Sequence, residues 1–180
     1  MLALPALLLG ALTWSLMEYV IHRWAGHGPK AVRNPFGKEH VRHHAEGNYF
    51  APTWKKALVA GGAVALLLWP ALAVAGPLVG GSWLAGFVGF YLTYEWLHRR
   101  AHTHAPKTAY GVWLRRHHFR HHYTDVKGNH GVTSPLWDHM WGTERPSAAP
   151  IRVPRKLAMP WLYDSAGEVD PQWSSDYVLR

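Results

Sequence analysis

Residues 83–102 read WLAGFVGFYLTYEWLHRRAH, an apolar segment that ends in two histidines. The segment carries no charge before Glu95, and His98 and His102 follow four residues apart. Side chains at positions i and i+4 share one face of a helix, so both imidazoles are expected to point the same way. This pattern predicts a helix that crosses a membrane and ends at a metal site.

The apolar residues of the chain are concentrated in two blocks, 2–20 and 57–97, and the second block is interrupted near Gly76 and Pro77. About 20 apolar residues are needed to cross a bilayer. A cleaved signal peptide is the alternative for the first block, but that block lacks a basic region and a small-residue cleavage site. The sequence therefore predicts an all-α, integral membrane helical protein with about three transmembrane helices, Leu2–Val20, Ala57–Ala75 and Leu78–Leu97.

The distribution of charge predicts the orientation of these helices. Nineteen Lys and Arg residues against 11 Asp and Glu residues give a net charge of +8. The basic residues lie between the first and second crossings and after the third, whereas the connection 76–82 has no charge. Because Lys and Arg favour cytoplasmic loops, both polar segments and the metal site are expected on the cytoplasmic face. The same distribution argues against nucleic-acid binding, and the absence of cysteine excludes disulfides and thiolate ligands.

Histidine is the unusual residue of this chain, with 14 copies that mostly occur in clusters. Two clusters are His-x-x-His-His boxes at 40–44 and 118–122, and two are pairs that follow the first and third crossings. A metal ion takes roughly four to six ligands, so ten histidines fit two ions better than one. The predicted metal ligands are His22, His27, His40, His43, His44, His98, His102, His118, His121 and His122.

The two halves of the chain repeat one pattern. In each half an apolar helix ends in a glutamate, Glu18 or Glu95, followed by a His-Arg pair and then by a box about twenty residues later. This predicts two similar helix pairs related by a pseudo-twofold axis, each supplying about half of the ligands. A ligating imidazole usually donates its other nitrogen to a carboxylate or carbonyl, so both glutamates are predicted acceptors. The alternative is that they are helix-end charges that reach the membrane interface.

The polar residues outside the clusters carry weaker signals. The turn-forming stretch 128–131 is expected to bring Asn129 or His130 to the edge of the metal site, and Asn129 is predicted to support the site without being a ligand. His117 is either a ligand or an exposed neighbour of the second box, and the exposed neighbour is favoured. No role is assigned to His104, His130 or His139, and no catalytic or substrate-binding residue is identified beyond the metal centre.

These motifs resemble those of the fatty acid hydroxylase/sterol desaturase superfamily of membrane histidine-box enzymes. The resemblance rests on the two boxes, the segments before them and residues 131–143, GVTSPLWDHMWGT, and it covers about Glu18 to Thr143. It implies a membrane di-iron domain at 1–143 that holds two iron ions, or zinc after purification, and uses O2 as co-substrate. The implied activity is hydroxylation of a lipid C–H bond, and residues 137–143 look most like the fatty acid 2-hydroxylase branch.

The resemblance also implies partners and leaves alternatives open. It implies a lipid substrate in the membrane and a separate electron donor of the ferredoxin or cytochrome b5 type with its reductase, since no cytochrome b5 domain is fused to this sequence. Lipid desaturation, or sterol or carotenoid oxidation, by the same centre is one alternative. A non-catalytic membrane protein that binds or transports metal is another, although transport usually needs polar residues inside the spans. Residues 144–180 are expected to form an irregular cytoplasmic tail.

Overall fold

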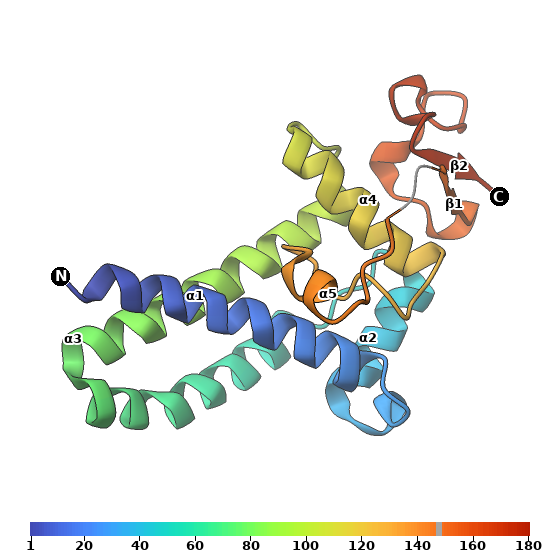
Figure 1. Cartoon of the computed structure of the whole chain (residues 1–180). Coiled ribbons are helices and arrows are strands. Elements are labelled where there is room, and N and C mark those ends of the chain that lie inside the picture. The colour runs from blue at the N-terminus through green and yellow to red at the C-terminus, as the bar shows by residue number, and fades with distance from the viewer. Residues whose placement is uncertain (147–148) are drawn as a thin grey trace. The chain divides into compact units, whose positions relative to one another are not determined.

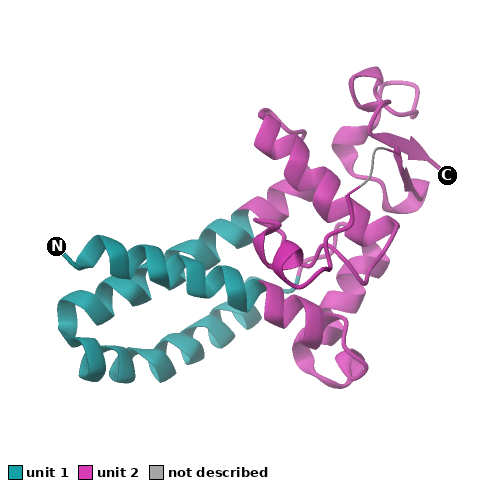
Figure 2. Cartoon of the chain, viewed as in Figure 1, with its two compact units in different colours: residues 1–18, 51–96 teal, residues 19–50, 97–180 magenta. Residues whose placement is uncertain are grey.

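The computed structural model describes residues 1–146 and 149–180, and helices dominate it (Figure 1). The chain forms two compact units, which Figure 2 colours separately: unit 1 comprises Met1–Glu18 and Ala51–Trp96, and unit 2 comprises Tyr19–Phe50 and Leu97–Arg180. All 14 histidines belong to unit 2, whereas unit 1 contains most of the apolar blocks. The division therefore separates the predicted membrane segments from the predicted metal ligands.

Two long apolar helices, α1 (Ala3–Val20) and α3 (Thr53–Thr103), supply unit 1. Segments containing them, Ala3–Gly26 and Thr53–Thr103, are long and apolar enough to cross a membrane. The α3 helix is interrupted at Gly76, whose φ of 74° and ψ of 169° are open to glycine and costly for other residues. Pro77 follows at once, and after it the second arm of α3 runs back in the opposite direction (Figure 1). The sequence therefore located both apolar helices and the reversal in the second.

The α1 helix packs closely on the second arm of α3. A Cβ atom placed on Gly10 would lie 1.9 Å from the carbonyl oxygen of Trp83, and one placed on Gly86 would lie 1.9 Å from that of Leu7. Small residues at a helix–helix interface let the two backbones approach this closely. The Trp14 ring adds an edge contact to Phe87, with 5.2 Å between ring centroids.

Unit 2 is built from short helices, and side-chain caps fix the starts of two of them, α2 (Pro35–Glu46) and α4 (Ala109–Tyr123). The Asn34 side chain accepts a hydrogen bond from the Gly37 amide at 2.7 Å, and Thr108 accepts one from the Gly111 amide at 3.0 Å. Such caps satisfy amides that have no partner within the helix. The elements of this part of unit 2 are the π-helical turn Ile21–Gly26, the 3₁₀ turn Ala31–Arg33, α2, the end of α3, α4 and α5 (Leu136–Met140).

The C-terminal segment differs from the irregular tail expected from the sequence. It contains two short parallel strands, β1 (Ile151–Val153) and β2 (Tyr177–Leu179), in which Ile151 pairs with Tyr177. Three 3₁₀ turns lie between the strands, at Arg155–Leu157, Pro160–Leu162 and Pro171–Trp173. The fold is therefore mostly helical rather than all-α. Strands of three residues are too short for alternation of polar and apolar residues to be recognised.

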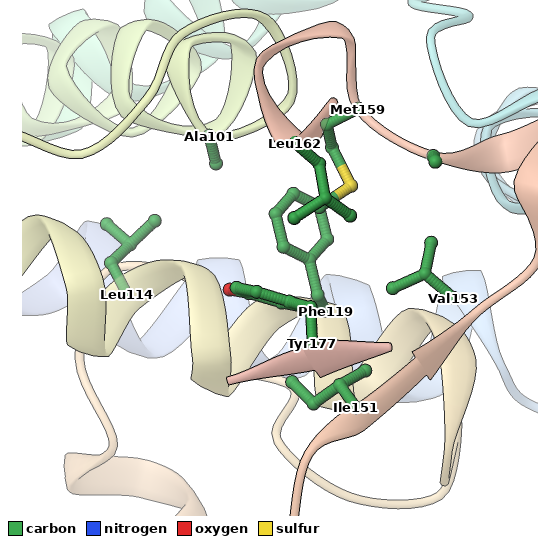
Figure 3. Packing of buried hydrophobic residues seen from close by; sticks show 9 residues of the cluster. Ala101, Leu114, Phe119, Ile151, Val153, Met159, Leu162 and Tyr177 are labelled. Atoms are coloured by element: carbon green, nitrogen blue, oxygen red, sulfur yellow. The ribbon is translucent and has the colours of Figure 1, made fainter. Parts of the chain in front are cut away.

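A buried apolar cluster joins this C-terminal segment to α4 (Figure 3). Phe119, on α4, and Met159 and Leu162, in the C-terminal segment, are fully buried within it. Burial of a side chain of this size stabilises the fold by roughly 1.5–3 kcal/mol. The described part of the predicted tail therefore belongs to the same unit as the histidines, although residues 147–148 within the tail lie outside the described residues.

Candidate metal centre

The ten predicted ligands come together in unit 2 as two groups of five. In each group the candidate ligand atoms all lie within 4.8 Å of one another. The first cluster consists of His22, His27, His40, His44 and His121. The second cluster consists of His43, His98, His102, His118 and His122.

Each His-x-x-His-His box supplies two histidines to one cluster and one histidine to the other. On α2, His40 and His44 belong to the first cluster, whereas His43 belongs to the second. On α4 the outer two histidines of the box belong to the second cluster, and His121 belongs to the first. Positions i and i+4 lie almost above one another on a helix, while position i+3 is offset to the other side of that line. The N-terminal half of the chain thus supplies four histidines to the first cluster and one to the second, and the C-terminal half supplies four to the second and one to the first. This reciprocal pattern is the one expected of a pseudo-twofold arrangement.

The imidazole nitrogens of the first cluster converge on one point. The Nε2 atom of His27 lies 2.7 Å from Nε2 of His40 and 2.8 Å from Nε2 of His121. The Nδ1 atom of His121 lies 2.7 Å from the carbonyl oxygen of Gly128. A carbonyl can only accept a hydrogen bond, so Nδ1 of His121 carries the proton and its Nε2 lone pair faces His27.

The second cluster has the same character. The Nε2 atoms of His102 and His118 lie 2.9 Å apart, and those of His43 and His98 lie 3.1 Å apart. Nδ1 of His43 donates to the carbonyl of Tyr49 at 2.6 Å, which leaves its Nε2 lone pair directed into the cluster.

Several buried nitrogens of the clusters have no hydrogen-bond partner among residues 1–146 and 149–180. They include Nε2 of His22 and both ring nitrogens of His122. Buried polar atoms are normally paired, because an unpaired one costs roughly 1–3 kcal/mol. Unpaired and mutually facing lone pairs are what a bound cation would satisfy, and imidazole suits iron, zinc and copper. The donor set therefore fits one metal ion in each cluster.

The electrostatics of the clusters keep these imidazoles neutral. Burial lowers the pKa of His22, His118 and His121 well below the usual value, and repulsion from neighbouring imidazoles lowers it further. Burial and the nearby His130 likewise lower the pKa of His27 to about 4. Only a neutral imidazole has a lone pair to offer a metal, so the clusters are prepared for metal binding at neutral pH.

Three residues were predicted to support the ligands from outside. The carboxylate of Glu95 forms an ion pair with Lys56, and Glu18 is buried. The amide of Asn129 donates to the carbonyl of His117 at 3.2 Å and accepts from the Arg145 amide at 2.7 Å, so it fixes the main chain. Their roles toward the imidazoles stay predictions.

The prediction that His117 is exposed is wrong. The residue is only 7% exposed, its ring stacks on Trp113 at 5.0 Å, and its Nε2 lies 3.5 Å from a carboxylate oxygen of Asp138. Adjacent side chains on a helix point in different directions, so His117 does not face the same way as His118. The His117 side chain points toward Asp138 on α5, a contact that sequence spacing does not reveal.

The unassigned histidines fall into two kinds. His130 is buried, and its ring lies 5.5 Å from that of His22 and 5.4 Å from that of His121. His104 and His139 are exposed, and His139 pairs with Glu144. His130 therefore borders the first cluster, a position that the turn-forming sequence around it suggested without fixing.

Comparisons with known proteins show which family this chain resembles. The model of the fatty acid hydroxylase family matches residues 7–143. The chain is 32% identical over 158 residues to the ceramide very long chain fatty acid hydroxylase scs7 of Schizosaccharomyces pombe, which covers 80% of this chain and 43% of the relative. It is 32% identical over 156 residues to the fatty acid 2-hydroxylase of Rattus norvegicus, covering 78% of this chain and 40% of the relative.

A solved structure extends the likeness to the fold. The structure of full-length scs7p, in which only the hydroxylase domain is visible, matches with a TM-score of 0.62 and 25% sequence identity. The match covers 82% of this chain and 59% of that one. The chain thus spans less than two thirds of the length of these relatives.

Proposed function

The chain belongs to the fatty acid hydroxylase family, and from this premise we propose that it hydroxylates a fatty acyl chain of a membrane lipid, with O2 as oxidant and two metal ions as cofactors. The overall reaction consumes O2, two electrons and two protons, and it yields a hydroxylated lipid and water. The observation that carries the proposal is the pair of buried five-histidine clusters. The relatives named above are hydroxylases of fatty acids or ceramide, which supports attack at the 2-position of an acyl chain.

The proposed metal is iron, held by the ten clustered histidines. Iron would supply the redox chemistry that zinc, which has no accessible second oxidation state, does not offer. The protein's part is to hold neutral imidazoles in fixed orientations and to keep water away. The Phe119 ring supports both tasks, because it lies 5.0 Å from the ring of His102 and is fully buried. The Phe50 ring also borders the second cluster, because it lies 5.1 Å from the ring of His43.

The setting of the reaction is also part of the proposal. The α1 helix and the two arms of α3 would cross the membrane as three spans, with unit 2 on the cytoplasmic face, because Lys and Arg residues flank the spans on that side. Electrons would come from a separate protein of the ferredoxin or cytochrome b5 type.

The direct test is the lipid content of cells that express the chain together with a reductase and donor. Mass spectrometry of lipid extracts is expected to show acyl chains that have gained one oxygen atom, derived from labelled O2. The product should vanish in His43→Ala and persist in His139→Ala, since His139 is exposed and outside both clusters. An unsaturated product would show that the chain is a desaturase. A protein that binds metal but causes no change in the lipids would contradict an oxygenase.

A further inference from the structure

The loop 128–131 contains two main-chain carbonyls that aim imidazoles of the first cluster. The carbonyl of Gly128 accepts a hydrogen bond from Nδ1 of His121 at 2.7 Å, and the carbonyl of His130 accepts one from Nδ1 of His22. In both imidazoles the proton is therefore on Nδ1 and the lone pair is on Nε2. The positions of these carbonyls decide how two of the five imidazoles are directed.

Each of these carbonyls belongs to a peptide group whose N–H is held by the segment 138–143. The carbonyl of His130 and the N–H of Gly131 form one planar peptide group, and that N–H donates to Oδ2 of Asp138 at 2.7 Å. The carbonyl of Gly128 shares a peptide group with the N–H of Asn129, which donates to the carbonyl of Thr143 at 3.0 Å. Because a peptide group is rigid, fixing its N–H also fixes its carbonyl.

The carboxylate of Asp138 is the centre of this arrangement. It is fully buried, its Oδ1 accepts from the His130 amide at 2.8 Å, and both oxygens are thus used by the loop. Burial raises the pKa of the carboxyl group, but the nearby His117 ring and the hydrogen bonds from Gly131, Thr143 and His130 outweigh burial and leave the pKa below its ordinary value. A charged acceptor polarises the peptide group and strengthens the hydrogen bond at its other end.

A chain of hydrogen bonds links Asp138 back to the segment that carries His22. The hydroxyl of Thr143 donates to Oδ1 of Asp138 at 2.7 Å and so has only a lone pair left for the hydroxyl of Tyr19, 2.9 Å away. Tyr19 then donates to Thr143 and accepts from Arg23 at 2.7 Å. The carboxylate is therefore linked to Tyr19 and Arg23, which precede and follow His22 in the sequence. It is also linked to the peptide group that accepts from the His22 imidazole.

We propose that Asp138 is a positioning residue for the metal ion of the first cluster, acting through the His130–Gly131 peptide group on the imidazole of His22. The inference rests on the proposed metal centre. The second cluster is supported differently: Nδ1 of His43 donates to the Tyr49 carbonyl, which Asp138 does not touch through any described hydrogen bond. The effect of Asp138 is thus confined to one of the two metal sites.

The test is Asp138→Asn, which keeps the shape of the side chain but replaces one acceptor oxygen by an N–H donor. In metal-free protein with ¹⁵N-labelled histidine, the ring signals of His22 are expected to change from a fixed Nδ1–H form to a mixture, while those of His43 stay unchanged. In metal titrations one site should weaken about 10- to 100-fold and the other should keep its affinity. The matched control is Asp176→Asn, a buried carboxylate of unit 2 that pairs with Arg116 and not with the loop.

The outcomes separate the inference from its premise. An unchanged His22 signal with two sites of ordinary affinity overturns the role of Asp138, as does equal weakening of both sites. If Asp138→Asn does not fold, Thr143→Val removes the hydroxyl that donates to Asp138 and accepts from Tyr19, and Tyr19→Phe, which removes only the hydroxyl of Tyr19, serves as its control. The absence of any shift at His22 in Thr143→Val, or an equal shift in Tyr19→Phe, overturns the role. A wild-type chain that binds no metal contradicts the proposed function, and the His22 signal of metal-free protein still decides the inference.

Discussion

Metal-free protein is expected to lose stability as the pH falls below about 6.5, the ordinary pKa of histidine. Burial, reinforced by neighbouring imidazoles, holds five histidines neutral in the folded chain well below that pH: His22, His40, His118, His121 and His122. The unfolded chain takes up protons at these positions first, so the free energy of unfolding rises with pH and is lost in acid.

The magnitude follows from the number of protons involved. Each histidine that is protonated only in the unfolded chain changes the free energy of unfolding by about 1.4 kcal/mol per pH unit. If only two of the five behave in this way down to pH 5.0, the loss is about 4 kcal/mol. Typical domains are stable by roughly 5–15 kcal/mol, so this loss is a large share of the total.

The assay is thermal unfolding of chelator-treated protein in detergent, followed by tryptophan fluorescence, since the chain has 11 tryptophans. The melting temperature should fall by about 10 °C between pH 7.5 and pH 5.0. His139→Ala, which alters an exposed histidine, should show the same fall. Equal melting temperatures at the two pH values would refute the reasoning, because they would mean that the clustered imidazoles are protonated alike in the folded and unfolded chains.

Three further predictions concern packing and ligand exchange. Phe119→Ala is expected to lower the free energy of unfolding by about 3–5 kcal/mol in denaturant titrations, because it empties a fully buried site; a loss below 1 kcal/mol would contradict the packing. His121→Ala should weaken metal binding mainly at the first cluster and His43→Ala mainly at the second, as metal titrations would show, and identical profiles would contradict the exchange between clusters. Gly86→Ala should lower the melting temperature, because its Cβ meets the main chain of α1, whereas Gly89→Ala, with open space around it, should not; equal melting temperatures would contradict the close helix contact.

The sequence alone predicted the features that depend on local geometry. Histidines at positions i, i+3 and i+4 share a helix face whatever the rest of the fold does, so the boxes at 40–44 and 118–122 could be recognised directly. The interruption of α3 at Gly76 was visible for the same reason, since a glycine followed by a proline breaks a helix locally.

The features that escaped prediction depend on tertiary contacts. Spacing does not reveal that His43 joins the cluster of His98 while His40 and His44 join the cluster of His27, because this depends on how α2 packs against the other helices. The hydrogen-bond acceptor of the His22 imidazole is a main-chain carbonyl. Every residue has such a carbonyl, so no residue type in the sequence shows which one accepts.

Ten imidazoles from distant parts of the chain are proposed to hold two metal ions. Their binding is measured by the metal content of the purified full chain combined with X-ray absorption at the metal edge. Two ions per chain are expected, each with a nitrogen-only protein shell and imidazole scattering. One ion or none per folded chain after iron reconstitution, or a shell dominated by carboxylate oxygen, would contradict this proposal.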